Sequence, residues 1–140
     1  MTPSDILELH HIRKTLPRMA IIEVLQESTA PLSEADIKQG MGKLYDRITF
    51  YRNVQTMLEA GILHRIIIDN TQVRYALNHC DEHHCHHQNH LHFYCKKCNG
   101  VTCLDAVLAA SQLVPEGYEA DEIEVLIQGT CKNCKELESA

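Results

Sequence analysis

Apolar residues in the first half of the chain recur at the spacing of amphipathic helices. A short, partly amphipathic segment occupies Ile6–Ile12. The pattern after it predicts three helices, over about 17–27, from Ser33 to Gly40 or Gly42, and over about 47–60. Ser33 is a good N-cap, although Asp36 replaces the Glu of a full capping box. Gly61 supplies the stop signal of the third helix.

A different periodicity begins directly after the third predicted helix. Residues 62–68 form a β-branched run, Asp69-Asn70-Thr71 has turn composition, and residues 72–77 alternate in character. This pattern predicts a β-hairpin. Three helices followed by a hairpin indicate a winged helix, a helix-turn-helix variant whose third helix enters the major groove. The alternative is a small α+β domain with a solvated helix face.

Polar side chains at the start of the third predicted helix favour DNA binding over that alternative. They can hydrogen-bond phosphates or base edges, and they are Arg47, Thr49, Tyr51, Arg52 and Asn53. Lys14 and Arg18 add positive charge upstream. The formal net charge of −6 does not oppose this interpretation, because residues 1–65 contain eight Lys or Arg and eight Asp or Glu. The acidic excess belongs to residues 66–140, with five against eleven.

The second half of the chain predicts strands and one helix. Alternation before Cys95 and the run at 100–104 indicate two strands around a knuckle, residues 105–114 indicate a helix, and residues 118–128 alternate as a further strand. We therefore expect an α+β chain in three parts: a winged-helix DNA-binding domain at 1–78, a His/Cys-rich loop at 79–89 and a small α/β domain at 90–140.

The cysteines predict a structural zinc site. The chain has seven cysteines, and it begins without an apolar signal region, so we expect a cytosolic protein with no membrane span, in which cysteines bind metal more often than they form disulfides. Two C-x-x-C pairs can supply four thiolates to one tetrahedral Zn²⁺, which leaves no open coordination position. They are Cys95, Cys98, Cys131 and Cys134. A redox dithiol or unligated cysteines are the alternatives.

A second metal site is predicted around His90 and His92. Alternate residues on a strand point to one face, so both imidazoles can reach one ion. Further ligands are expected from Asp69 or from the preceding loop, which contains Cys80, His83, His84, Cys85, His86 and His87. A thiolate from Cys80 or Cys85 would favour zinc over iron. The alternative is a solvated histidine tract that binds metal adventitiously.

No catalytic signature accompanies these ligands. The zinc-protease pattern H-E-x-x-H, the deaminase pattern H-x-E with P-C-x-x-C, and the nucleophile motif G-x-S-x-G are all absent from the sequence. We therefore expect a protein that is not an enzyme.

Several motifs together resemble those of the ferric uptake regulator family. They occur in the family's order and cover nearly the whole chain: Thr15-Leu16-Pro17-Arg18, Ile48-Thr49-Phe50-Tyr51-Arg52-Asn53-Val54, His90-Leu91-His92-Phe93-Tyr94-Cys95-Lys96-Lys97-Cys98 and Gly129-Thr130-Cys131-Lys132-Asn133-Cys134. The resemblance implies a homodimer with N-terminal winged helices and C-terminal α/β dimerisation domains. It also implies that metal binding near a hinge, here 79–89, favours the DNA-binding arrangement.

The resemblance also implies roles for particular residues. Tyr51 would touch bases, and Arg52, Arg18 and Lys14 would touch the DNA backbone. The four cysteines would hold one structural zinc per chain. His90 and His92 would bind the sensed metal, joined by Asp69 and a loop cysteine. Cys103 receives no role.

One departure from the family pattern indicates the branch. Iron- and peroxide-sensing members typically add a histidine just before the second helix, where this chain has Thr29-Ala30-Pro31-Leu32-Ser33. Cys80 and Cys85 resemble the zinc-uptake branch. We therefore expect a cytoplasmic, zinc-sensing repressor of a palindromic double-stranded DNA operator. The alternative regulatory metals are Fe²⁺ and Mn²⁺. Within the family, the alternative function is that of an iron or peroxide sensor. Outside this class of regulators, the alternative is a zinc-storage or zinc-delivery protein.

Overall fold

A computed structural model describes residues 1–78, 89–104, 113–121 and 123–138. The contacts divide the chain into two compact units, Met1–His79 and Cys80–Ala140, called below the N-terminal and C-terminal units. The predicted helix at 105–114 falls almost entirely outside the described residues, as does the His/Cys-rich loop except for its last residue. Among the described residues, no helix is long and apolar enough to cross a bilayer.

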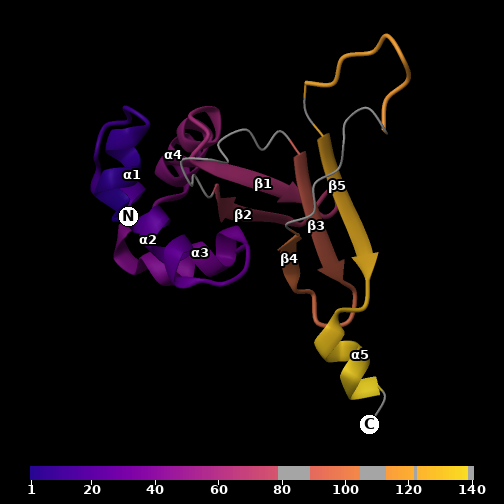
Figure 1. The fold of residues 1–140 in the computed structure, drawn as a ribbon. Coiled ribbons are helices and arrows are strands. Elements are labelled where there is room, and N and C mark those ends of the chain that lie inside the picture. The colour runs from indigo at the N-terminus through magenta and orange to yellow at the C-terminus, as the bar shows by residue number, and fades with distance from the viewer. Residues whose placement is uncertain (79–88, 105–112, 122, 139–140) are drawn as a thin grey trace. The chain divides into compact units, whose positions relative to one another are not determined.

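The N-terminal unit contains the predicted helices and hairpin (Figure 1). Its elements are α1 (Pro3–Leu9), α2 (Leu16–Glu27), α3 (Glu34–Met41), the 3-10 turn η1 (Gly42–Leu44), α4 (Arg47–Glu59), β1 (Leu63–Ile67) and β2 (Val73–Leu77). The first helix is an addition to the three expected, and it starts earlier than the amphipathic segment at Ile6. A capping box between Thr2 and Asp5 sets this start, because it satisfies backbone N–H groups of the first turn.

The helix caps explain where α3 and α4 begin. Ser33 and Asp36 form a complete capping box, so the shorter Asp side chain serves where the sequence pattern favours Glu. The Asp46 carboxylate accepts a hydrogen bond from the Thr49 backbone N–H at 3.0 Å. That hydrogen bond lowers the pKa of Asp46 and keeps its charge at the positive end of the helix dipole.

The core of the N-terminal unit joins the helices to the hairpin. Strands β1 and β2 pair antiparallel, and an isolated bridge from Leu32 to Tyr75 attaches the segment before α3 to the hairpin. The Phe50 ring on α4, only 1% exposed, packs edge-on against Tyr75. The other core residues come from α1, α2, α3 and α4, and from the start of β1 with the residue before it: Leu7, Ile21, Ile22, Leu25, Ile37, Met41, Val54, Met57, Ile62 and Leu63.

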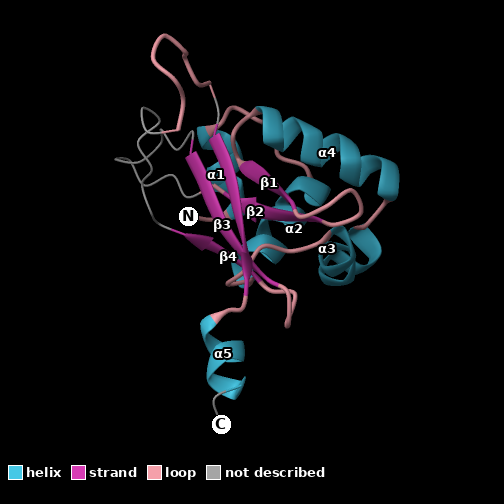
Figure 2. Ribbon diagram, turned by 90° about the vertical axis from the view of Figure 1, so that its right-hand side faces the viewer, coloured by secondary structure: helices cyan, strands magenta, loops and turns pink. Residues whose placement is uncertain are grey.

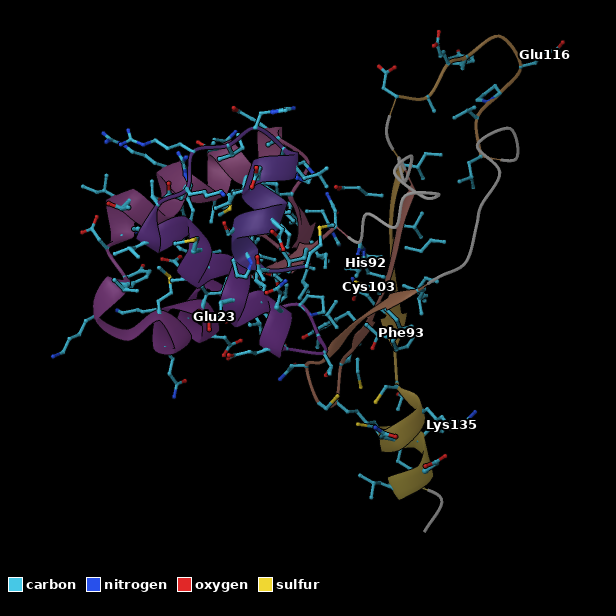
Figure 3. The ribbon with its side chains drawn as sticks, turned by 60° about the vertical axis from the view of Figure 1, so that its left-hand side comes forward. Glu23, His92, Phe93, Cys103, Glu116 and Lys135 are labelled. Atoms are coloured by element: carbon cyan, nitrogen blue, oxygen red, sulfur yellow. The ribbon has the colours of Figure 1, made fainter. Side chains whose placement is uncertain are left out.

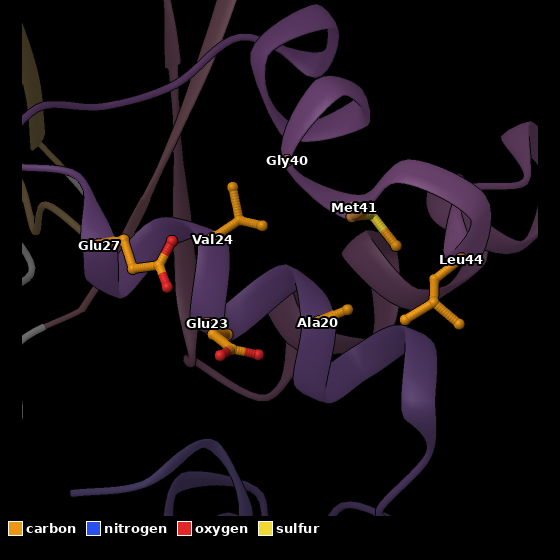
Figure 4. Close-up of a pocket in the computed structure, with 7 residues that line it drawn as sticks. All are labelled: Ala20, Glu23, Val24, Glu27, Gly40, Met41 and Leu44. Carbon is orange, nitrogen blue, oxygen red and sulfur yellow. The ribbon is translucent and has the colours of Figure 1, made fainter.

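Helices α2 and α3 approach each other closely at Gly40. A Cβ atom at this position would stand 2.8 Å from Cγ1 and 2.9 Å from Cγ2 of Val24. Beside this contact lies a shallow hollow of about 210 Å³ (Figure 4), lined by Ala20, Glu23, Val24, Glu27, Gly40, Met41 and Leu44. The missing side chain of Gly40 therefore sets the spacing of the two helices.

Replacing Gly40 with Ala is expected to destabilise the N-terminal unit by about 1 kcal/mol. Alanine gains roughly 1 kcal/mol of helix propensity over glycine, but overpacking typically costs about 1–3 kcal/mol. Urea denaturation followed by circular dichroism would measure the change. In a Val24→Ala background the added methyl has room, so Gly40→Ala should there become neutral or stabilising. A stabilising effect in the wild-type background would contradict the close helix contact.

The described residues of the C-terminal unit form a three-stranded sheet followed by a helix (Figure 2). Strand β3 (Asn89–Cys95) lies between β4 (Val101–Leu104), with which it pairs antiparallel, and β5 (Ile123–Gly129), with which it pairs parallel. The predicted strand at 118–128 starts later than expected, because residues 113–121 form turns, with Gly117 at a φ of 88°. The residues after Cys131 form α5 (Lys132–Glu138), a helix that the sequence pattern did not predict.

Candidate metal centres and the DNA-facing helix

The sheet topology brings the two C-x-x-C pairs together. Because β3 and β5 are parallel, their carboxyl ends lie at the same edge of the sheet. The register places Cys95 beside Gly129, two residues before Cys131. The first pair runs from the last residue of β3 into the tight turn after it, and the second pair runs from the junction of β5 and α5 into α5. The sequence prediction that the four cysteines converge is confirmed.

The spacing of the four thiols fits a tetrahedral zinc ion. All four Sγ atoms lie within 4.8 Å of one another, and Sγ of Cys98 is 3.8 Å from Sγ of Cys131. Zinc–sulfur bonds of about 2.3 Å in a tetrahedron require sulfur–sulfur distances of about 3.8 Å. The donor set is therefore both chemically and geometrically suited to one Zn²⁺ with no open position.

Hydrogen bonds prepare this cluster to bind a cation. The backbone N–H groups of Cys98 and Cys131 donate to Sγ of Cys95 and lower the pKa of that thiol to about 6. Cys134 shows the opposite shift: its hydrogen bond with the Cys131 thiol, together with burial, raises its pKa to about 12. Four adjacent thiols cannot all ionise without a compensating cation. A dication at the centre would remove that conflict, since zinc deprotonates its thiol ligands.

The turn after β3 is held in place by contacts on both sides of the thiols. Asn99 adopts a left-handed backbone with a φ of 60°, and its side chain accepts a hydrogen bond from the Tyr94 hydroxyl at 2.8 Å. A Cβ atom at Gly100 would stand 3.3 Å from Sγ of Cys98. An ion pair between Lys97 and Glu138 attaches the turn to α5. These contacts fix the first cysteine pair against the second.

His92 and Cys103 form a second pair of metal donors within the C-terminal unit. They stand directly opposite each other on β3 and β4, and both side chains can be followed in Figure 3. His92 is only 5% exposed, whereas Cys103 is exposed. Cys103 was given no role from the sequence. The hairpin register around the Cys95–Cys98 turn, which pairs position 94 with 101 and 92 with 103, is the signal that identifies it.

His64 is a candidate ligand in the N-terminal unit that sequence reasoning missed. Its Nδ1 lies 2.6 Å from Oδ1 of Asn78, whose Nδ2 donates to the carbonyl oxygens of Gly61 at 2.7 Å and Leu63 at 3.3 Å. Because the amide nitrogen is committed to these carbonyls, Oδ1 must accept from His64. The neutral imidazole therefore carries its proton on Nδ1 and its lone pair on Nε2, as metal-binding histidines do.

The other predicted ligands of the second metal are Asp69, His90 and the two loop cysteines. Asp69 lies in the hairpin turn, where its Oδ1 accepts hydrogen bonds from Thr71 N, Thr71 Oγ1 and Gln72 N at 2.8–2.9 Å. These bonds lower the pKa of Asp69 and give the carboxylate a role in the turn. His90 lies on β3, two residues from His92. Cys80 and Cys85 lie outside the described residues.

The predicted DNA-contact residues of α4 divide between surface and core. Arg47, Tyr51 and Arg52 are exposed and Thr49 is half-buried. Asn53, expected among the polar contacts, is only 7% exposed, and its Oδ1 accepts a hydrogen bond from Nε of Arg18 at 3.0 Å. Asn53 therefore ties α4 to α2 instead of facing solvent.

The basic residues upstream of α4 already have intramolecular partners. Arg18 is half-buried and also donates from its guanidinium to the carbonyl oxygen of Arg13 at 2.9 Å. Lys14 forms an exposed ion pair with Glu8 at 3.0 Å. Such surface pairs contribute little to stability, so Lys14 can exchange Glu8 for a phosphate at small cost.

Comparison with known proteins identifies a single family. Residues 10–128 match the model of the ferric uptake regulator family. Ferric uptake regulation protein 2 of Mycolicibacterium fortuitum is 25% identical over an alignment of 139 residues. The match covers 93% of this chain and 90% of that protein.

Solved structures show the same fold. The ferric uptake regulator of Francisella tularensis with iron is 27% identical and superposes with a TM-score of 0.65, covering 89% of this chain and 95% of that one. A zinc uptake regulator complexed with zinc and DNA superposes with a TM-score of 0.71 at 19% identity, covering 98% of this chain and 93% of that one. At that identity the second likeness bears on the fold alone.

Proposed function

The chain belongs to the ferric uptake regulator family of metal-responsive transcription regulators, and on this premise we propose that it is a zinc-sensing repressor. In this proposal the protein acts in the cytoplasm as a homodimer on a palindromic operator. One zinc per chain is structural and a second metal is regulatory. The fold-level relatives include both an iron-bound and a zinc- and DNA-bound regulator, so the donor chemistry must decide the metal.

The pairing of His92 with Cys103 is the observation that carries the choice of zinc. A cysteine thiolate directly across from a buried imidazole makes a mixed sulfur and nitrogen donor set. Such sets favour Zn²⁺, whereas Fe²⁺ and Mn²⁺ sites are richer in nitrogen and oxygen donors. We propose that the regulatory ligands come from Asp69, Cys80, Cys85, His90 and His92, and additionally from Cys103, which stands opposite His92. The turn hydrogen bonds of Asp69 make it the weakest member of the set.

The proposed switch is driven by binding of the regulatory metal. Metal binding would favour one arrangement of the winged helices, and by linkage DNA would tighten metal binding by the same factor. The residues proposed to contact DNA are Lys14, Arg18, Arg47, Thr49, Tyr51 and Arg52.

Serine substitutions at Cys80, Cys85 and Cys103 are expected to abolish the zinc response. In the wild type, zinc added after the regulatory site has been stripped should tighten operator binding, measured by fluorescence anisotropy at fixed salt. The triple Ser variant should show no tightening, because a neutral hydroxyl is a poor zinc ligand at pH 7. It should still contain one zinc per chain from the four-cysteine site.

The same experiment separates the rival functions. An iron sensor with nitrogen and oxygen ligands would keep its response to Fe²⁺ after the three Ser substitutions and would not require the thiols. A storage or delivery protein would bind several weak zinc ions per chain and no particular DNA sequence. A wild-type protein whose operator affinity ignores zinc would contradict the proposal.

A further inference from the structure

The Glu34 carboxylate accepts hydrogen bonds from two tyrosine hydroxyls. Glu34 is the first residue of α3 and is half-buried. The Tyr51 hydroxyl donates to its Oε2 at 2.5 Å, and the Tyr45 hydroxyl donates to its Oε1 at 2.6 Å. Each carboxylate oxygen thus takes one phenol proton. The start of α3 is thereby connected to the surface of α4 that is proposed to face DNA.

Ring packing and charge hold this arrangement in place. The buried Phe50 ring contacts both phenols, with its centroid 5.7 Å from that of Tyr45 and 5.5 Å from that of Tyr51. The hydrogen bond to Glu34, with some burial, raises the pKa of Tyr51, and the nearby Arg47 guanidinium acts against this shift. The same carboxylate raises the pKa of Tyr45 to about 12. At neutral pH both phenols therefore keep their protons and direct them at Glu34.

This arrangement limits what Tyr51 can offer to DNA. A tyrosine hydroxyl has one donor and two acceptor lone pairs. With the donor committed to Glu34, the 45% exposed side chain offers an acceptor oxygen and the ring. In the major groove an acceptor pairs with the amino groups of adenine or cytosine, while guanine N7 and O6 and thymine O4 are themselves acceptors.

We propose that Glu34 is a specificity-determining positioning residue that makes Tyr51 an acceptor-only reader of an adenine or a cytosine. The proposal rests on the proposed function, since it requires α4 to lie in the major groove. Glu34 does not itself touch the base. It fixes the rotamer of Tyr51 and the direction of its proton, and without it the hydroxyl can turn outward and also donate to guanine or thymine.

Selection from DNA duplexes with a randomised centre tests this role. The zinc-loaded wild type should recover a common sequence, and Tyr51→Phe should lose the base-pair preference at one position of each half-site. Removing the amino group there, with purine in place of adenine or 2-pyrimidinone in place of cytosine, should weaken binding of the wild type and not of Tyr51→Phe. Glu34→Ala should lose the same preference and lower the ratio of operator to random-DNA affinity about tenfold. In a Tyr51→Phe background Glu34→Ala should change neither quantity.

A charge-matched control and a second variant complete the test. Glu59→Gln removes one negative charge from the far end of α4, so it should change DNA affinity uniformly and leave the base preference intact. Should Glu34→Ala fail to fold, Glu34→Met keeps the side-chain length and carries the same expectation. The proposal is overturned if the folded Glu34 variant selects the wild-type sequence at the same ratio, or if removing the adenine or cytosine amino group at the position lost in Tyr51→Phe leaves wild-type affinity unchanged. Failure of the wild type to select any sequence would overturn the proposed function as well.

Discussion

Replacing Cys95 with Ser is expected to remove one zinc ion per chain and to unfold the C-terminal unit. Cys95 is 1% exposed, and its thiol accepts the hydrogen bonds that organise the cluster. Structural zinc contributes roughly 10–16 kcal/mol to small domains that fold around it, more than the whole stability of most domains. The N-terminal unit has its own core, so it should keep a cooperative unfolding transition.

Two measurements check this expectation. Elemental analysis counts zinc per chain after dialysis against a weak chelator, and heteronuclear NMR follows the amides of the two units separately. Cys103→Ser is the matched control, because Cys103 does not belong to the four-cysteine cluster, and it should retain the structural zinc and the C-terminal amide spectrum. A Cys95→Ser protein with unchanged zinc content and a folded sheet would show that the cluster is not the structural site.

His92→Ala is expected to abolish the effect of zinc on operator affinity and to leave the proposed structural zinc in place. Removing this buried imidazole deletes the donor that stands opposite Cys103. Allosteric coupling between two sites typically changes affinity about 5–150-fold, so the zinc-induced tightening of operator binding should fall from that range to none. Affinity in the absence of zinc should remain within about twofold of wild type, since α4 is unaltered.

Anisotropy titrations with and without zinc, at one fixed salt concentration, give the coupling as a ratio of two dissociation constants. His10→Ala is a suitable control, because His10 lies on the N-terminal unit and its Nδ1 contacts the Ile6 carbonyl oxygen at 2.9 Å. His92→Asn also removes the imidazole but leaves a smaller cavity, so the same result in both variants would show that lost packing is not the cause. If either His92 variant responded to zinc as the wild type does, His92 would not be a regulatory ligand.

The convergence of the four cysteines could be predicted from the sequence because two separate C-x-x-C pairs both indicate it. Each C-x-x-C pair has metal-ligand spacing, and both pairs had to meet for a tetrahedral ion, which in turn required the strand at 123–129 to return beside the strand at 89–95. The winged-helix elements were likewise predictable from the switch between helical and alternating periodicity. In both cases a local pattern agrees with the tertiary structure.

Other features had no local pattern to reveal them. The segment 132–138 carries little apolar periodicity, so α5 was not predicted from the sequence. His64 stands beside Arg65 in an otherwise apolar run, and its tautomer is set by Asn78, fourteen positions away across the hairpin. Glu34 meets Tyr51, seventeen positions later, only because the fold brings the first residue of α3 beside the surface of α4. Each of these depends on contacts between elements that the spacing within one element does not encode.

The parallel pairing of β3 with β5 has a consequence for the order in which the chain folds. Cys95 and Cys131 are thirty-six positions apart, and the contacts that join them close a long loop before any stabilisation is gained. Helices and a hairpin built from nearby residues, as in Met1–His79, form early during synthesis at about 5–20 residues per second. The sheet must instead wait for β5 to leave the ribosome. At the proposed structural site, zinc would therefore be captured only after translation of the second cysteine pair, and the thiols of Cys95 and Cys98 would lack their partners until that moment.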